Sequence, residues 1–249
     1  MELSLWARTS GTWINVATVL IGTGLGLWLR HRLPQQMRQI ITQAVGLLTL
    51  VSGFAMANSL FEVQAGPIDG IILGLIALVT GGLLGEWLQI EQRLIALGDL
   101  LKRQFKGGGR FTEGFVAASL LFCIGPMTVL GSLNNGLVGD NTLLSLKATM
   151  DCFAAIALTG TYGIGVGFSS LTVLLVQGTL SLMAGSLSAV IVDPTQDPQV
   201  LITTGIGGMV IIGLGLGLLE VAAVRVASFL PALVIGPLVV AIARQWAGA

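Results

Sequence analysis

Long apolar runs separated by short charged connections constrain this chain more than any other feature. The runs lie near residues 12–29, 39–60, 68–88, 113–133, 143–160, 166–192, 199–219 and 228–243. A helix needs about 20 apolar residues to cross a bilayer, and a closed helix is required because lipid cannot satisfy free backbone N–H and C=O groups. We therefore expect an all-α, polytopic transmembrane helical bundle with eight spans. Seven spans are the alternative, because Pro231 and Pro237 interrupt the last, short run.

The charge content separates this chain from soluble proteins. Only 10% of its residues are charged, whereas a soluble domain carries about a quarter. Its 12 Lys and Arg balance its 12 Asp and Glu, so net charge gives no reason to expect a nucleic-acid partner. A water-soluble enzyme is excluded on this basis, and the lipid bilayer is the partner that the composition requires.

The placement of the basic residues predicts the orientation. Eight of the twelve fall in two connections, at Arg30, Arg32, Arg38, Arg93, Lys102, Arg103, Lys106 and Arg110. Connections 61–67, 134–142 and 193–198 contain none. Because Lys and Arg are enriched in cytoplasmic loops, we expect connections 30–38 and 89–112 to be cytoplasmic and the N-terminus to be outside. The expected location is the cell inner (plasma) membrane.

We expect one integral membrane domain over residues 1–249. The Gly-rich stretch at residues 107–109 is the predicted hinge between two halves, 1–106 and 110–249, within a basic cytoplasmic loop.

Glycines spaced four apart recur in three runs, at Gly22 and Gly26, Gly81 and Gly85, and Gly213 and Gly217, and Gly163 and Gly167 add a further pair. This spacing lets a neighbouring helix backbone approach closely, either within the chain or in a homo-oligomer. The recurrence of this glycine spacing in three runs is either an internal duplication or a chance result of the chain's 35 glycines.

Gly125-Pro126 interrupts the fourth run. A proline cannot donate the helical hydrogen bond and disfavours helical angles in the residue before it, so we expect a broken helix here. Transporters place ion and substrate sites at such breaks. A simple kink, repaired by a neighbouring Ser or Thr hydroxyl, is the structural alternative.

Lys147 and Asp151 are the strongest candidate site residues. They lie four residues apart in the fifth run, and hence on one helix face. A charge within a span costs at least about 2.5 kcal/mol, so we expect the pair to face the bundle interior. Lys147 has the alternative of snorkelling to the interface, and the pair together has the alternative of a salt bridge that only fixes packing.

Neutral ligands are expected from Thr128, Ser132, Asn134, Asn135 and Asn15. Asp140 is either a further ion ligand or the N-cap of the fifth span, and Asn15 is either a ligand or a hydrogen-bonding link between helices. The sequence lacks the motifs of common enzymes and metal sites, so we expect no enzymatic activity, no cofactor and no metal site.

Several of these positions together resemble a known family. They are Gly11 to Asn15, Gly22, Gly26, Leu33-Pro34, Gly85-Glu86, Glu91, Asn134 to Asp140, Lys147 and Asp151. The chain resembles the YqgA-like and YdfK-like bacterial inner-membrane proteins, catalogued as domain of unknown function 554. The resemblance implies a polytopic bacterial membrane protein, sometimes described as a transporter, and supplies no established binding residues. The chain departs from some relatives at Asn135, where an acid would be expected.

The leading hypothesis is a membrane transporter or channel for a small ion or polar solute, with its site at the broken fourth span and the start of the fifth. The sign of an ion is open, since Asp151 with neutral oxygens suits a cation and Lys147 suits an anion. The alternative is a non-transporting membrane scaffold or regulatory subunit, which expects a dry interior.

Overall fold

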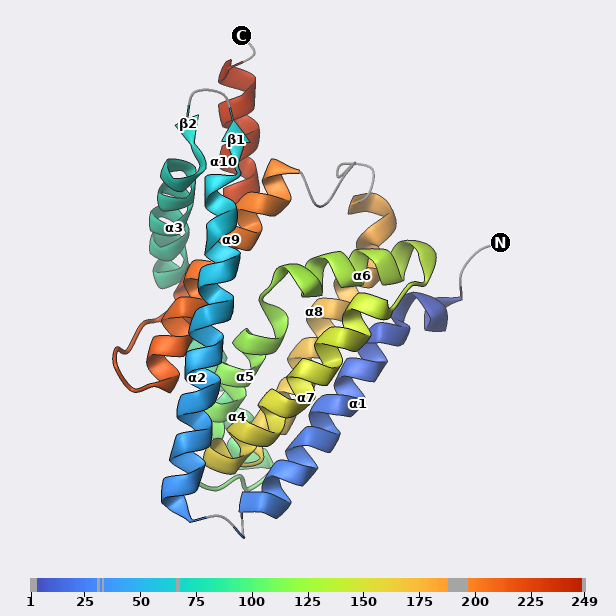
Figure 1. Cartoon of the computed structure of the whole chain (residues 1–249), viewed down its shortest axis with the longest axis vertical. Coiled ribbons are helices and arrows are strands. Elements are labelled where there is room, and N and C mark those ends of the chain that lie inside the picture. The colour runs from blue at the N-terminus through green and yellow to red at the C-terminus, as the bar shows by residue number, and fades with distance from the viewer. Residues whose placement is uncertain (1–3, 31, 33, 66–67, 188–196, 248–249) are drawn as a thin grey trace. The chain divides into compact units, whose positions relative to one another are not determined.

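The computed structural model describes residues 4–30, 32, 34–65, 68–187 and 197–247 (Figure 1). Its long helices are α1 (Leu5–Arg30), α2 (Gln35–Ala57), α3 (Gly70–Trp87), α4 (Ile90–Gln104), α5 (Phe111–Cys123), α6 (Pro126–Val138), α7 (Thr142–Tyr162), α8 (Gly165–Leu187), α9 (Pro198–Leu218) and α10 (Ala232–Ala247). The short elements are the 3-10 turns η1 (Asn58–Phe61) and η2 (Val226–Phe229) and an antiparallel hairpin of β1 (Gln64–Ala65) and β2 (Ile68–Asp69).

The expected all-α bundle is confirmed. Within the described residues, seven helical segments are long and apolar enough to cross a membrane, or eight if the bent pair α5 and α6 counts as one span. The predicted run at 166–192 corresponds to α8, and its residues 188–192 lie outside the described residues, as do residues 193–196 of the next connection.

The chain divides into two compact units. Unit 1 comprises residues 1–45 and 95–191, and unit 2 comprises residues 46–94 and 192–249. The division falls inside α2 and α4 rather than at the glycines of residues 107–109.

Unit 1 is built around the contact between α1 and α7, which run side by side (Figure 1). α8 packs against α1, α5 and α6. Its apolar core contains side chains with almost no exposure, among them Phe111, Phe115, Phe122, Leu144, Leu158 and Val166. The hydroxyls of Thr42 and Thr161 join the first half of α2 to the end of α7. These contacts leave one face of α1, carrying Trp13, Leu20 and Trp28, exposed and apolar, as a lipid-facing surface requires.

The glycine spacing predicted in the first span produces the close approach of α1 to α7. A Cβ at Gly22 would lie 2.5 Å from the carbonyl oxygen of Cys152, and one at Gly26 would lie 2.6 Å from that of Ile156. A methyl group does not fit at either distance. In contrast, Gly163 ends α7 with φ +83, so it does not share a helix face with Gly167, and that part of the prediction is wrong.

Unit 2 packs α10 against α3 and α9. Gly81 on α3 allows the contact with α10, because a Cβ there would lie 2.5 Å from the backbone of Ala232. Gly85 instead allows α3 to approach η2, because a Cβ there would overlap the Ser228 carbonyl. α9 begins with Asp197 as its N-cap, whose Oδ1 accepts a hydrogen bond from the Gln199 amide at 2.7 Å, and Pro198 occupies the first turn. In the first turn a backbone N–H has no helical acceptor, so the missing N–H of Pro costs nothing there, and the Asp-Pro pair is a favourable helix start.

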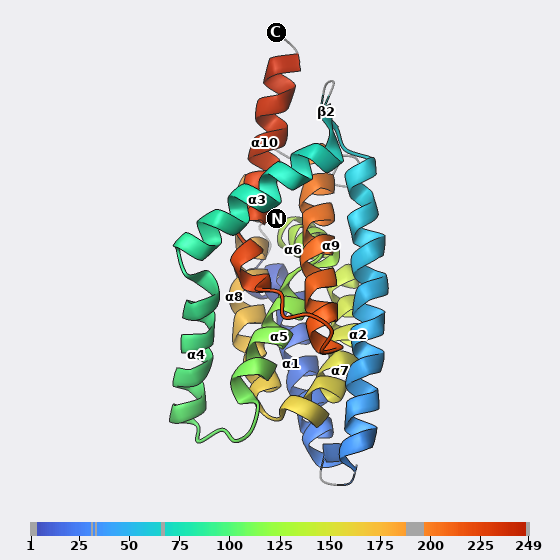
Figure 2. The same cartoon turned by 90° about the vertical axis from the view of Figure 1, so that its left-hand side faces the viewer.

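Helix α4 is an element that the sequence analysis did not predict. It follows α3 after Gln89, whose φ is +52, and is visible as a separate helix in Figure 2. Its less exposed positions include Ile90, Leu94, Gly98 and Leu101, which recur at helical spacing. α4 is therefore an amphipathic helix within the connection that was expected to be a loop.

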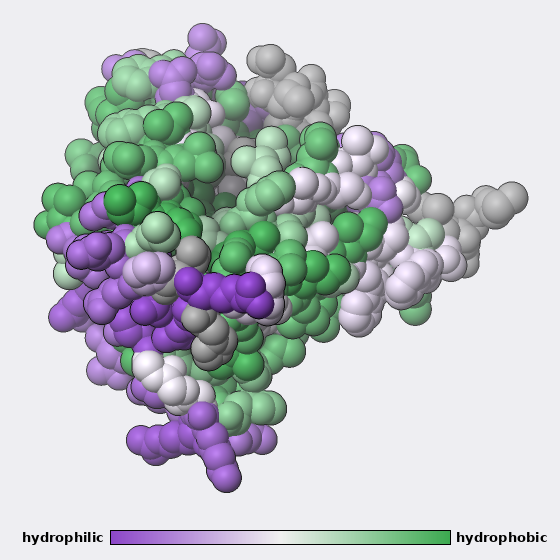
Figure 3. Space-filling view, turned by 60° about the horizontal axis from the view of Figure 1, so that its bottom comes forward, coloured by the Kyte–Doolittle hydropathy of each residue, from purple (hydrophilic) through white to green (hydrophobic). Residues whose placement is uncertain are grey.

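Two arginines of unit 1, Arg30 and Arg110, lie near the same end of its helices. A Cβ at Gly163 would meet the Arg30 guanidinium, which also lies 3.7 Å from a Cβ position at Gly109. Arg110 stacks over the Tyr162 ring at 4.9 Å. The end of α1, the connection before α5 and the link between α7 and α8 thus meet in a cationic group. Figure 3 shows hydrophilic side chains gathered beside broad areas of hydrophobic residues.

Candidate functional site

A buried ion pair on α7 is the centre of the candidate site. Nζ of Lys147 donates a hydrogen bond to Oδ2 of Asp151 at 2.5 Å, and the two side chains are only 8% and 9% exposed. Lys147 therefore points inward rather than snorkelling to the interface, and Nζ lies 6.0 Å from the centre of the Phe122 ring on α5. The expected inward-facing pair is what the structure contains, and its net charge is zero.

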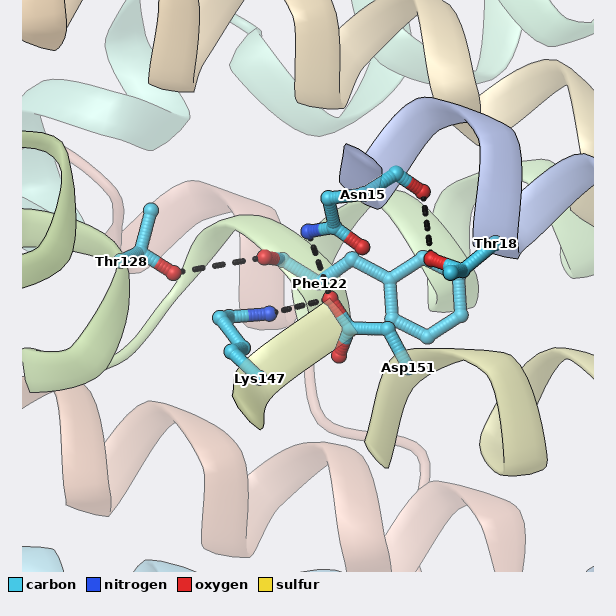
Figure 4. A network of polar contacts seen from close by, with 6 residues as sticks. All are labelled: Asn15, Thr18, Phe122, Thr128, Lys147 and Asp151. Atoms are coloured by element: carbon cyan, nitrogen blue, oxygen red, sulfur yellow. Dashed lines mark hydrogen bonds and ion pairs between the residues drawn. The ribbon is translucent and has the colours of Figure 1, made fainter. Parts of the chain in front are cut away.

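Asn15 connects this pair to α1. Its Nδ2 donates to Oδ2 of Asp151 at 2.9 Å, and its side chain is fully buried (Figure 4). Both contacts to Asp151 fall on Oδ2, so Oδ1 accepts no hydrogen bond from the residues that the structure describes. Oδ1 of Asn15 likewise has no partner among these residues. Two acceptor oxygens are thus free for a ligand beside the ion pair.

The break between α5 and α6 lies next to the pair. Gly125 has φ 149 and ψ 155, a conformation that glycine alone adopts readily, and Pro126 starts α6. The axes of α5 and α6 differ by 61°. Thr128 is fully buried, and its hydroxyl donates to the Phe122 carbonyl at 3.4 Å (Figure 4). The break expected from the sequence is present, and a threonine hydroxyl satisfies one of its freed carbonyls.

Asn135 belongs to a separate cluster at the start of α1. Its Oδ1 accepts from the Gly11 amide at 3.0 Å, and its Nδ2 donates to the Ala7 carbonyl and to Oγ of Ser10. Oγ of Ser10 also accepts from Asn141. The Asn135 amide is therefore fully used in joining α6 to α1.

The remaining predicted ligands have different surroundings. Ser132 is fully buried on α6, and its Oγ has no partner within the described part of the chain. Asn134 is half-buried in α6, which continues through Val138 instead of ending before Asn134 as expected. Asp140 is exposed, and its carboxylate accepts from both the amide and the hydroxyl of Thr142 at the start of α7. These hydrogen bonds lower the pKa of Asp140.

The sequence analysis missed Gln177, Ser181 and Thr12. All three are completely or almost completely buried, and their side-chain polar atoms have no hydrogen-bond partner among the described residues. A signal existed for Gln177, because it is the only amide side chain between Gly165 and Leu187.

Neither cysteine is bonded, and the described residues contain no group of three or more His, Cys, Asp or Glu side chains that could hold a metal ion.

A second set of charges lies in unit 2. Arg225 forms an ion pair with Glu86, whose other oxygen accepts from the Ser228 hydroxyl at 3.3 Å. Glu91 is less exposed, and Oε2 has no hydrogen-bond partner within the described ranges. Burial raises the pKa of the Glu91 carboxyl above its usual 4.5, against smaller opposing effects from the Ala227 backbone and Arg225.

This raised pKa predicts a pH dependence of stability. Folded Glu91 holds its proton more tightly than unfolded Glu91, so its stabilising contribution is complete below pH 4.5 and is lost as the pH rises through the raised pKa. We expect Glu91→Gln to reduce the loss of thermal stability as the pH rises above 4.5. Thermal unfolding in detergent measures this, with exposed Glu62→Gln as the control that leaves the difference unchanged. An equal effect of both variants would contradict the assignment.

The apolar helices, the broken helix and the buried charges define a polytopic α-helical membrane protein. The chain matches the family described as "Protein of unknown function (DUF554)" over residues 10–241 and belongs to that family. This confirms the resemblance seen in the sequence.

Two relatives match the chain over most of its length and of their own. The chain is 28% identical to "Uncharacterized membrane protein YdfK" of Bacillus subtilis (strain 168) over 231 residues, 92% of this chain and 95% of the relative. It is also 28% identical to "Uncharacterized protein YqgA" of Escherichia coli (strain K12) over 232 residues, 90% and 93% of the two chains. No solved structure matches the chain.

Proposed function

We propose that this protein is a non-enzymatic membrane transporter or channel for a small ion or polar solute. The observation that carries the proposal is the buried Lys147–Asp151 pair, held by Asn15 beside the break between α5 and α6. Taking two charges out of water costs several kcal/mol per ion in a real protein, and mutual attraction often fails to repay it. A purely structural helix contact would be made more cheaply by apolar side chains, so the retained charges favour a role in binding.

The free oxygens define the roles of the residues. Oδ1 of Asp151 and Oδ1 of Asn15 accept hydrogen bonds from the passing species, while Lys147 and Asn15 orient the Asp151 carboxyl through Oδ2. Thr128 and Ser132 line the adjacent face of α6, both fully buried. Asn135 joins α6 to α1, and Asp140 is exposed with Oδ1 bound to Thr142, so we assign them to holding the ends of α1, α6 and α7 in place. Asn134 is half-buried and remains a candidate ligand.

We further propose that the protein lies in the inner membrane with its N-terminus outside and the two basic connections in the cytoplasm. The contact of Arg30 with the Gly109 and Gly163 region supports this, because it brings the two predicted cytoplasmic connections to the same end of unit 1.

A membrane scaffold is the second candidate function. The pairing of Lys147 with Asp151 favours it, because each charge already has a partner. In that case Asn15 only links α1 to α7, and glycine-lined faces outside the α1–α7 contact join the protein to a second copy or to another protein.

Flux measurements separate the two functions. We expect the protein in liposomes to pass at least one of Na⁺, K⁺, Cl⁻, glycerol and urea. Because Asp151→Asn leaves Lys147 without its counter-charge, the informative variant is Lys147→Gln/Asp151→Asn, which removes both charges. We expect this double variant to fold and to lose at least about nine-tenths of the flux, because charge-assisted hydrogen bonds are about twice as strong as the neutral ones that Gln and Asn can make.

The exposed Glu62→Gln change is the matched control and is expected to keep full flux. If the unaltered protein passes none of the five probes, the transport proposal is wrong and the scaffold remains.

A further inference from the structure

The Gln177 side chain on α8 is the strongest feature that the proposed site does not use. It is 0% exposed, and neither Oε1 nor Nε2 has a hydrogen-bond partner among the residues that the structure describes. Ser181, one helical turn further on the same face, is also fully buried with a free Oγ. A buried polar group without a partner is costly, and native proteins contain few of them. Three such atoms on one face of one helix therefore point to a ligand.

Two neighbouring helices present further free polar atoms to this face. A Cβ at Gly178 would lie 4.0 Å from Cγ2 of Thr12 on α1, and Oγ1 of Thr12 has no partner within the described residues. A Cβ at Gly136 on α6 would overlap the Ser181 carbonyl, so α6 and α8 touch here. Ser132, with its free Oγ, lies one turn before Gly136. α1, α6 and α8 all contact one another, so these buried side chains lie on three helices that pack together.

The chemistry of the free atoms restricts the ligand. Nε2 of Gln177 can only donate, Oε1 of Gln177 and Oδ1 of Asn15 can only accept, and the hydroxyls of Thr12, Ser132 and Ser181 can do either. A ligand that uses all of them must carry both donors and acceptors. A bare cation would use the oxygens and leave Nε2 unsatisfied, and an anion would leave the amide oxygens unsatisfied.

Charge balance points the same way. Lys147 and Asp151 cancel each other, and the free groups of Gln177, Ser181, Ser132 and Thr12 are neutral. Arg8, at the start of α1, directs its guanidinium to the carbonyls of Gly136 and Leu182. An ion moved from water into such a neutral interior loses its hydration without gaining a counter-charge, whereas a neutral polar molecule loses only hydrogen bonds that these amides and hydroxyls replace.

We propose that Gln177, Ser181, Ser132 and Thr12 form a binding site for a small neutral solute rich in hydrogen-bonding groups, of the polyol or amide class. The site extends the one at Asn15 and Asp151 and rests on the proposed transport function. Gln177 is its specificity-determining residue, because its amide supplies one end that only donates and one that only accepts.

The test uses the full chain in liposomes and stopped-flow light scattering. Glycerol and urea gradients report solute entry, a sucrose gradient reports water movement, and separate tracer assays report Na⁺, K⁺ and Cl⁻. We expect glycerol or urea permeability above that of empty liposomes and no ion flux. Gln177→Met, which keeps the length of the side chain but removes its hydrogen bonds, is expected to lower that permeability about tenfold.

Two controls keep the result interpretable. Gln43→Met makes the same change at an exposed position of α2 and is expected to leave permeability unchanged. Thermal unfolding of Gln177→Met is expected to match or exceed that of the unaltered chain, since an unpartnered amide is replaced by an apolar group. Equal permeability of Gln177→Met and the unaltered chain overturns the proposal.

The outcomes also separate this inference from the transport function. Flux of Na⁺, K⁺ or Cl⁻ that depends on Asp151, without glycerol or urea flux, overturns the neutral-solute assignment and leaves the transporter standing. Water movement without glycerol or urea flux also overturns the neutral-solute assignment and leaves the transporter standing. Absence of all flux overturns both proposals.

Discussion

Replacing Lys147 with methionine is expected to lower the free energy of unfolding by about 3–5 kcal/mol. Methionine fills most of the space of the lysine stem but removes the charge that pairs with Asp151 at 2.5 Å. The Asp151 carboxylate would then be buried with Asn15 as its only remaining hydrogen-bond donor among the described residues. The change in unfolding free energy can be measured by denaturant titration in detergent micelles.

Two further variants identify the cause of this loss. Lys147→Met/Asp151→Leu removes both charges, and replacing both partners of a buried ion pair by apolar groups is often neutral or stabilising by about 1–4 kcal/mol. We therefore expect the double variant to regain most of the stability. Lys106→Met makes the same change at an exposed position and is expected to alter stability by no more than about 0.5 kcal/mol. If Lys147→Met is as stable as the unaltered chain, Asp151 does not carry a buried charge.

The spans and the ion pair could be predicted from the sequence because each depends on local information. A run of 20 apolar residues spans a bilayer whatever its neighbours are, and two charges four residues apart share a helix face. The sequence analysis could not pair Asn15 with Asp151, because they are 136 positions apart and only the packing of α1 on α7 brings them together. It offered Asn15 as a candidate and left its partner open.

The helix boundaries and the amphipathic helix α4 were harder to predict. α4 was missed because its charged residues were taken to mark a connection between two spans. Its less exposed residues nevertheless recur at helical spacing, at Ile90, Leu94, Gly98 and Leu101. α6 runs past Asn134 because its end is set by Gly139, which has φ +76, and not by the polar pair. Amides favour turns only weakly when a tertiary partner is available, and Asn135 has three.

The polar face of α8 was missed for a different reason. A serine in a spanning helix often bonds to a carbonyl of its own helix, as Ser169 does with Val166 at 2.6 Å. The sequence therefore cannot distinguish a satisfied serine from one that is free, such as Ser181. A longer side chain such as Gln177 is a stronger signal, because in hydrocarbon an amide that is not needed would be replaced by leucine at no cost.

The close contact of α1 with α7 gives the second large effect. Gly22→Ala and Gly26→Ala are each expected to lower the free energy of unfolding by about 1–3 kcal/mol, because the added methyl groups would lie 2.5 Å and 2.6 Å from backbone carbonyl oxygens of α7. Neither oxygen can move aside without shifting the whole helix. The same shift would separate Asn15 from Asp151, so both variants are expected to lose solute flux as well as stability.

Gly24 provides the matched control on the same helix. A Cβ there would meet no atom within 4 Å, and alanine is a better helix former than glycine by about 1 kcal/mol, so Gly24→Ala is expected to keep or raise stability. Because the three positions lie within five residues, they share the same helix and the same intrinsic preference for alanine over glycine. A difference between Gly24→Ala and its two neighbours therefore measures the α1–α7 contact itself, and equal stability of all three variants would show that the two helices do not approach as closely as described.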